Sequence, residues 1–292
     1  MELDLPAIIA TLIVLAALGG SAALWFARLL MPRSSIQQHV PVPPWAIGWS
    51  NFGIFICSLV VAVYLVQSMG MLFMVDRIPT DESGELILTP WFAIVSIILL
   101  QGALIAVYYV TRNYFPHQFA GRMNSTGLGL FEAMRRAIPA FFRFLPIIWG
   151  TSLLWNGILM ILQKFEVIGE TPPQELIQLF GAGGEPLAIA ILVLFAVVAA
   201  PIVEEIIFRG CLYRFLKSKT MIPFAQFLSG ILFALMHGNL MSFGPLLIVG
   251  ILLAHVYESE GNLKVAICFH ALFNSFSLLM LLLISQSSVI PQ

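Results

Sequence analysis

The sequence predicts an all-α polytopic membrane protein with about eight transmembrane helices. Three observations predict this fold class. The chain of 292 residues is 60% hydrophobic and only 10% charged, and its mean hydropathy is +0.96, a composition that soluble domains do not have. Its apolar residues form runs of about 20, the length that crosses a bilayer. Its basic residues gather in alternate loops, as the positive-inside rule describes.

Eight apolar runs define the expected spans. In chain order they are 7–27, 45–69, 91–110, 140–162, a fifth that runs from 187 to the basic residues near 217, and then 223–240, 243–257 and 263–284. Residues 126–137 combine apolar side chains with paired arginines, and we expect a short amphipathic helix there that lies in the membrane interface. Residues 174–180 are expected to add a helical turn or two to an outer loop. The chain 1–292 is expected to form one membrane domain, in which helices of unassigned role occupy 1–165 and a catalytic core occupies 187–285.

The distribution of basic residues orients the expected spans. The loops after spans one, three and five, together with the start of span eight, hold Arg28, Arg33, Arg112, Arg122, Arg135, Arg136, Arg214, Lys217, Lys219 and Lys264. The opposite loops hold only Arg77 and Lys164. Both termini are therefore expected outside, with the basic loops in the cytoplasm of what we expect to be a bacterial plasma membrane. The acidic N-terminus lacks the basic start of a signal peptide, so the first run is expected to be a permanent span.

Charged residues inside the fifth run are the first candidates for function. Glu204, Glu205 and Arg209 follow an uncharged stretch that begins at residue 187, and an ionisable residue at membrane depth is a functional hypothesis by default. Glu205 and Arg209 are four residues apart, so they share a helix face and are expected to neutralise each other. Glu204 is rotated by about 100° from Glu205. We therefore expect Glu204 to face a cavity instead.

Three more polar residues lie in the apolar runs of the C-terminal half. His237 follows Phe233 by four residues at the end of the sixth run, and His270 and Asn274 are four apart in the eighth. With alternating span directions, Glu204, His237 and His270 fall at similar depths. They are expected to meet in one cavity that opens to the cytoplasm.

Two chemistries fit this set of side chains. In hydrolysis, Glu204 takes a proton from water with help from His237, while His270 and Asn274 donate hydrogen bonds to the developing oxyanion. Alternatively, His237, His270 and Glu204 hold zinc with an open position for water. We favour the reading without a tightly bound metal, because an asparagine is a poor zinc ligand and a good oxyanion donor.

These motifs resemble a known family. Glu204-Glu205-x-x-x-Arg209, Phe233-x-x-x-His237 and His270-x-x-x-Asn274 are similar, in order and spacing, to the three motifs of the CPBP (Abi) family of intramembrane proteases, which includes the type II CAAX prenyl endopeptidases. The resemblance implies an eight-helix fold, a glutamate that activates water and an inward-facing site. The family is commonly labelled metalloprotease, and a metal-free mechanism has also been argued for it.

The sequence therefore predicts an intramembrane endopeptidase. Its expected partners are membrane lipid and a peptide or lipidated-peptide substrate, either CAAX-like or bacteriocin-like; the net charge of −1 argues against a nucleic acid. Two other function classes stay open. One is a non-catalytic immunity or scaffold protein of the same fold, and the other is a proton-coupled transporter, which the lack of inverted repeats disfavours.

Overall fold

The computed structural model describes residues 4–30, 42–80, 87–115, 123–172, 179–180 and 185–285. These residues form helices and no strand, which confirms the all-α fold class. The N-terminal helices are α1 (Leu5–Leu30), α2 (Trp49–Met74), α3 (Pro90–Tyr114) and α4 (Leu130–Lys164). A short helix of type 3-10, η1 (Val75–Arg77), extends α2.

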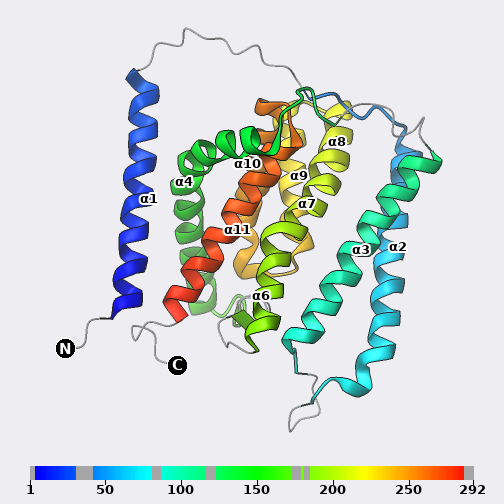
Figure 1. The fold of residues 1–292 in the computed structure, drawn as a ribbon, viewed down its shortest axis with the longest axis horizontal. Coiled ribbons are helices and arrows are strands. Elements are labelled where there is room, and N and C mark those ends of the chain that lie inside the picture. Colours follow the sequence, from blue (N-terminus) through cyan, green and yellow to red (C-terminus); the bar gives the residue numbers. More distant parts are fainter. Residues whose placement is uncertain are drawn as a thin grey trace.

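The C-terminal half begins with one long helical run, Pro186–Lys219. It consists of α6 (Pro186–Leu194), η2 (Phe195–Ala199), α7 (Ala200–Glu205), η3 (Ile206–Tyr213) and α8 (Arg214–Lys219), of which η2 and η3 are π-helical. Three helices follow, α9 (Ile222–Met236), α10 (Leu240–Glu260) and α11 (Leu263–Ser285). In Figure 1, α2 and α3 form a hairpin at one side, α1 stands at the other, and α4 and the C-terminal helices lie between them.

Seven helices of the described part are long and apolar enough to cross a membrane. The expected sixth span is the exception, because α9 has only 15 residues. At about 1.5 Å per residue it is shorter than the hydrocarbon core is thick. The polytopic prediction is thus confirmed with seven long helices and one short apolar helix in place of eight equal spans.

The N-terminal part of α4 differs from its prediction. The expected interfacial helix and the fourth span form one 35-residue helix that contains both Pro139 and Pro146. Figure 1 shows this helix turning from across the end of the bundle to along it. Prolines remove backbone donors and commonly kink a helix, but a helix in lipid has no water to compete for its remaining hydrogen bonds. Of the turn expected at 174–180, only residues 179–180 are described, and they are helical.

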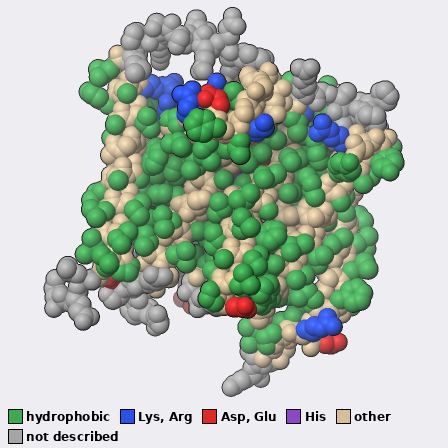
Figure 2. All heavy atoms as spheres, viewed as in Figure 1, with side chains coloured by type: hydrophobic (Ala, Val, Ile, Leu, Met, Phe, Trp, Pro, Cys, Tyr) green, Lys and Arg blue, Asp and Glu red, His purple; other side chains and the backbone are tan. Residues whose placement is uncertain are grey.

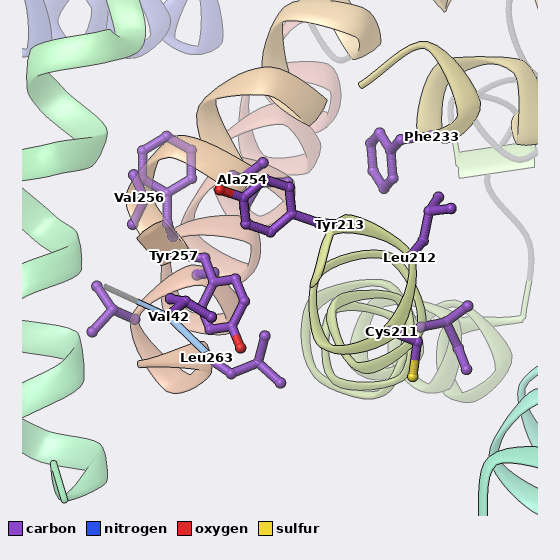
Figure 3. Packing of buried hydrophobic residues seen from close by; sticks show 14 of the residues in the cluster. Val42, Cys211, Leu212, Tyr213, Phe233, Ala254, Val256, Tyr257 and Leu263 are labelled. Atoms are coloured by element: carbon purple, nitrogen blue, oxygen red, sulfur yellow. The ribbon is translucent and has the colours of Figure 1, made fainter. Parts of the chain in front are cut away.

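The main core forms where α10 packs against its neighbours. Tyr213, Phe233 and Tyr257 are fully buried in it. Figure 3 shows Tyr213 reaching toward Tyr257 of α10, with Val42 and Leu263 close by. The outside of the molecule is largely hydrophobic, and Figure 2 shows Lys and Arg side chains gathered toward one end of it. That end corresponds to the basic loops; which compartment it faces stays a prediction.

Candidate active site

The helix that carries the acidic pair is irregular on both sides of that pair. In the π-helical segment η2, the Ala200 N–H donates to the carbonyl of Phe195 rather than to that of Ala196. The next residue, Pro201, has no N–H to offer. The carbonyl of Ala196 therefore lacks a backbone donor, and the Asn274 Nδ2 atom of α11 donates to it at 2.7 Å. Such π-helical insertions occur often at functional sites.

Glu205 and Arg209 form a buried ion pair. The Arg209 Nη1 atom lies 2.8 Å from Glu205 Oε1, and both side chains have no exposed surface. Arg209 also donates through Nη2 to the carbonyl of Gly250 at 2.9 Å, and its guanidinium carbon lies 4.5 Å from the centre of the Phe233 ring. The predicted neutralisation of Glu205 by Arg209 is therefore confirmed in geometry.

Glu205 has a second partner that the sequence did not indicate. Its Oε1 atom also lies 2.9 Å from Nδ1 of His270 on α11. Because a carboxylate beside a guanidinium only accepts hydrogen bonds, Nδ1 of His270 carries a hydrogen. Glu205 thus fixes the orientation of the imidazole and leaves its Nε2 atom to face the rest of the site, as carboxylates do for histidines in many functional centres.

Glu204 lies on a different face from Glu205, as predicted. Its side chain is 19% exposed, whereas that of Glu205 is fully buried. The Glu204 Oε2 atom is itself buried and has no hydrogen-bond partner. Nε2 of His270 lies 3.9 Å from this atom, which is too long for a direct hydrogen bond.

His237 does not lie within a helix. The helix α9 ends at Met236, and His237 follows as its C-cap residue, so its expected position inside the sixth span is wrong. Its Nδ1 atom lies 2.8 Å from the carbonyl of Phe233. Since a carbonyl only accepts, Nδ1 carries a hydrogen, and in the neutral imidazole the lone pair is then on Nε2. That tautomer of the half-buried ring can accept a proton.

The ring of Phe233 links the two histidines. Its centre lies 4.8 Å from that of His237 and 5.7 Å from that of His270. Together with the Arg209 contact, these distances place motif residues from three helical segments around one aromatic ring. The four side chains Glu204, Glu205, Arg209 and His270 form a continuous polar cluster, and Phe233 connects His237 to it.

The zinc alternative needs three ligands in one place. Among the described residues, no group of three His, Cys, Asp or Glu side chains is arranged to hold a metal ion. Glu204 and His270 approach each other, and the bond from Nδ1 of His237 to a backbone carbonyl leaves its Nε2 atom available as a ligand. The three expected ligands are not gathered around one point in the described residues, and zinc binding stays a prediction.

Two comparisons with known proteins gave matches. A protein named "Putative membrane peptidase YdiL", from Bacillus subtilis, is 30% identical to this chain over 93 residues, which make up 32% of this chain and 38% of that protein. The match therefore spans less than half of the relative's length. No solved structure matches this chain significantly.

A family model matches the segment that holds the site. Residues 186–276 match the family described as type II CAAX prenyl endopeptidase Rce1-like. This segment contains Glu204, His237, His270 and Asn274, and the helices α1–α4 lie outside it. The resemblance of the three sequence motifs is therefore confirmed: residues 186–276 of this chain are similar to the Rce1-like type II CAAX prenyl endopeptidases.

Proposed function

We propose that this protein is an intramembrane endopeptidase that hydrolyses a peptide bond in a membrane-associated substrate, with Glu204 as the base that activates water. The observation that carries the proposal is the position of Glu204 Oε2. This atom is buried, lacks a hydrogen-bond partner and faces His270 Nε2 at 3.9 Å. A water molecule about 2.8 Å from both atoms fits that separation.

The reaction begins with proton transfer from water to Glu204. The oxygen of the water then attacks the carbonyl carbon of the scissile bond, and the carbonyl oxygen becomes an oxyanion. Glu204 delivers the proton to the amide nitrogen, the C=O bond re-forms, and the C–N bond breaks to release the amine and the new carboxyl end. His237 supports this transfer through its Nε2 lone pair. A positioned general base contributes roughly 10²–10⁴-fold to such reactions.

The oxyanion needs preorganised donors. His270 donates through Nε2 when it carries hydrogens on both nitrogens, and its bond from Nδ1 to Glu205 holds the ring in place. Asn274 uses one amide hydrogen for the carbonyl of Ala196, and the second is free to serve the oxyanion.

The test is cleavage of a fluorogenic lipidated or membrane-anchored peptide library by the full chain in liposomes. We expect Glu204→Gln to lower the rate by about 10³-fold, because the amide has nearly the same shape but cannot take the proton. The matched control is Glu170→Gln, since Glu170 is exposed and lies outside the site. Cleavage by Glu204→Gln at the control's rate would contradict the proposal.

A non-catalytic or transport function gives other results. A scaffold or immunity protein leaves all peptides uncut and keeps its cellular phenotype in the Glu204→Gln variant. A proton-coupled transporter accumulates solute in liposomes only under a pH gradient. Either result, with no cleavage by the native chain of any peptide in the library, would replace the endopeptidase assignment.

A further inference from the structure

A second polar cluster lies away from the candidate active site, where α1 meets α4. The Trp25 Nε1 atom of α1 donates to the carbonyl of Arg143 in α4 at 3.1 Å. Arg28 follows Trp25 by three residues and therefore lies on the same side of α1. The bond from Trp25 therefore brings this side of α1 to the backbone of Arg143, and the charge of Arg28 acts on the Arg143 guanidinium.

The third member of the cluster comes from α10. The ring of His255 packs edge-on against that of Phe144, with their centres 5.9 Å apart. Phe144 is the neighbour of Arg143 in α4, and His255 also interacts electrostatically with Arg28. Three helices therefore contribute the guanidinium groups of Arg28 and Arg143 and the imidazole of His255 to one basic site.

Among the described residues, neither Arg28 nor Arg143 forms an ion pair, and the Arg143 Nε atom is buried without a hydrogen-bond partner. Glu260 attracts Arg143 and Glu258 attracts His255, but both acids are bonded to other cations. Glu260 pairs with Arg136 at 3.2 Å, and Glu258 pairs with Lys217 at 2.5 Å. Buried polar groups normally have partners, and cations within a membrane domain normally pair with anions. The arrangement indicates an external anion.

The surroundings indicate which anion it is. The end of α1 exposes large apolar side chains beside the basic site, with Phe26 62% and Leu29 81% exposed, as expected of a surface that faces lipid. Guanidinium groups bind phosphate oxygens through paired hydrogen bonds, and basic pockets between transmembrane helices bind the headgroups of anionic lipids. We infer that Arg28, Arg143 and His255 bind a phosphate group, which the headgroup of an anionic phospholipid supplies.

A bound headgroup would also attach α1 to the rest of the molecule. The helix α1 packs on α4 and α11 through an apolar sequence with three buried residues, Ala10, Ala17 and Ser21. Its described polar link to α4 is the single bond from Trp25. A phosphate shared by Arg28, Arg143 and His255 adds a charged link between α1, α4 and α10 at the same end.

The test uses the full chain in nonionic detergent, with native mass spectrometry and thermal unfolding as two readouts. The probes are phosphatidylglycerol, phosphatidylcholine with the same acyl chains, and inorganic phosphate. We expect one phosphatidylglycerol to stay bound and to raise the Tm by about 5 °C at saturation. Phosphatidylcholine and inorganic phosphate should raise the Tm by less than about 1 °C. In Arg28→Gln/Arg143→Gln, phosphatidylglycerol should bind at least about 10-fold more weakly.

Two matched controls distinguish binding at this site from general attraction of the anionic lipid to basic residues. Arg135→Gln removes a cation at the same end that is already paired with Glu132, and Arg77→Gln removes one that donates to the carbonyl of Phe73. Both should bind phosphatidylglycerol like the native chain. Equal binding by the Arg28/Arg143 double variant would overturn the inference, and a full Tm shift with inorganic phosphate would overturn the lipid as its source. Native mass spectrometry reads binding from the folded ions, so a less stable variant still gives an answer.

Discussion

Buried polar side chains are distributed unequally between the two halves of this molecule. In the described part of α1–α4, the buried polar residues are neutral, Ser21 and Gln101. In the helices from residue 186 onward they include Glu205, Arg209, Arg214, Glu258 and His270. Since charged groups are costly to bury in a membrane unless they are paired, the C-terminal half must be specified by its hydrogen bonds as well as by its packing.

Burial singles out α10 and does not follow the division into halves. In the most apolar stretch of α10, 44% of the residues are buried, against 17% in α1, in α2 and also in the C-terminal α11. Long helices of both halves thus expose much of their surface, whereas α10 is the most buried of them. The segment similar to the endopeptidase family, 186–276, coincides with the polar half. The comparison suggests that polar contacts fix the C-terminal helices, while the N-terminal helices tolerate exchange of apolar residues.

The largest difference between the halves is expected for arginine. Arg209→Leu leaves Glu205 buried without its cation, and we expect it to lower the free energy of unfolding by about 3–5 kcal/mol. Arg77→Leu, in the N-terminal half, removes an exposed side chain and should change it by less than about 0.5 kcal/mol. Titration with SDS in mixed micelles measures both. A loss below about 1 kcal/mol for Arg209→Leu would contradict the expected difference between the two halves.

Two glycines test whether the helices of the two halves differ in how closely they pack. A Cβ atom at Gly230 would lie 2.9 Å from the carbonyl oxygen of Leu247 and 3.0 Å from the backbone nitrogen of Ile251, so α9 and α10 must separate. We expect Gly230→Ala to destabilise by about 1–3 kcal/mol. At Gly102 in α3, a Cβ atom would meet nothing within 4 Å.

The same exchange at Gly102 should therefore be neutral or stabilising by up to about 1 kcal/mol, because alanine favours a helix. Thermal unfolding of both variants in one detergent tests this opposite sign. Equal losses at Gly230 and Gly102 would show that the close crossing of α9 and α10 has no special role in stability.

The smallest difference is expected for two amide side chains that donate to backbone carbonyls. Asn274→Ala leaves the carbonyl of Ala196 without a donor and should destabilise by about 1–2 kcal/mol. In the N-terminal half, Gln67 donates to the carbonyl of Ser96 at 3.0 Å, within the regular helix α3. Gln67→Ala should cost about 0.5 kcal/mol, since that carbonyl keeps its helical donor.

The unfolding free energies of Asn274→Ala and Gln67→Ala, measured side by side, test this difference. Equal losses would mean that the Ala196 carbonyl in the π-helical segment η2 does not depend on the hydrogen bond from Asn274. The measurement therefore also tests whether Asn274 has a structural role beside the role proposed for it at the oxyanion.

The sequence predicted features that depend on neighbours along one helix. Runs of apolar residues predicted where the helices lie, and the spacing of Glu205 and Arg209 predicted their pair, because residues four apart share a helix face. It also predicted that Glu204 and Glu205 point different ways. These are local consequences of helical geometry.

Features that depend on contacts between helices were missed. The bond from His270 to Glu205 joins residues 65 positions apart, and no spacing reveals which nitrogen faces which carboxylate. The π-helical segment η2 depends on an unusual backbone bond from Ala200, although Pro201 beside it is a signal that could have indicated an irregular helix. The early end of α9 at Met236 likewise places His237 outside the helix predicted for it.

The central claim is that Glu204 and His270 act together on one hydrolytic step. A double-mutant cycle on the peptide cleavage rate in liposomes tests it most directly, with Glu204→Gln, His270→Ala and the double variant. We expect each single exchange to lower the rate by about 10³-fold. If Glu204 and His270 act as a unit, the double variant should lose about the same 10³-fold and no more. Losses that multiply to about 10⁶-fold would show that the two side chains serve separate steps and would contradict the account.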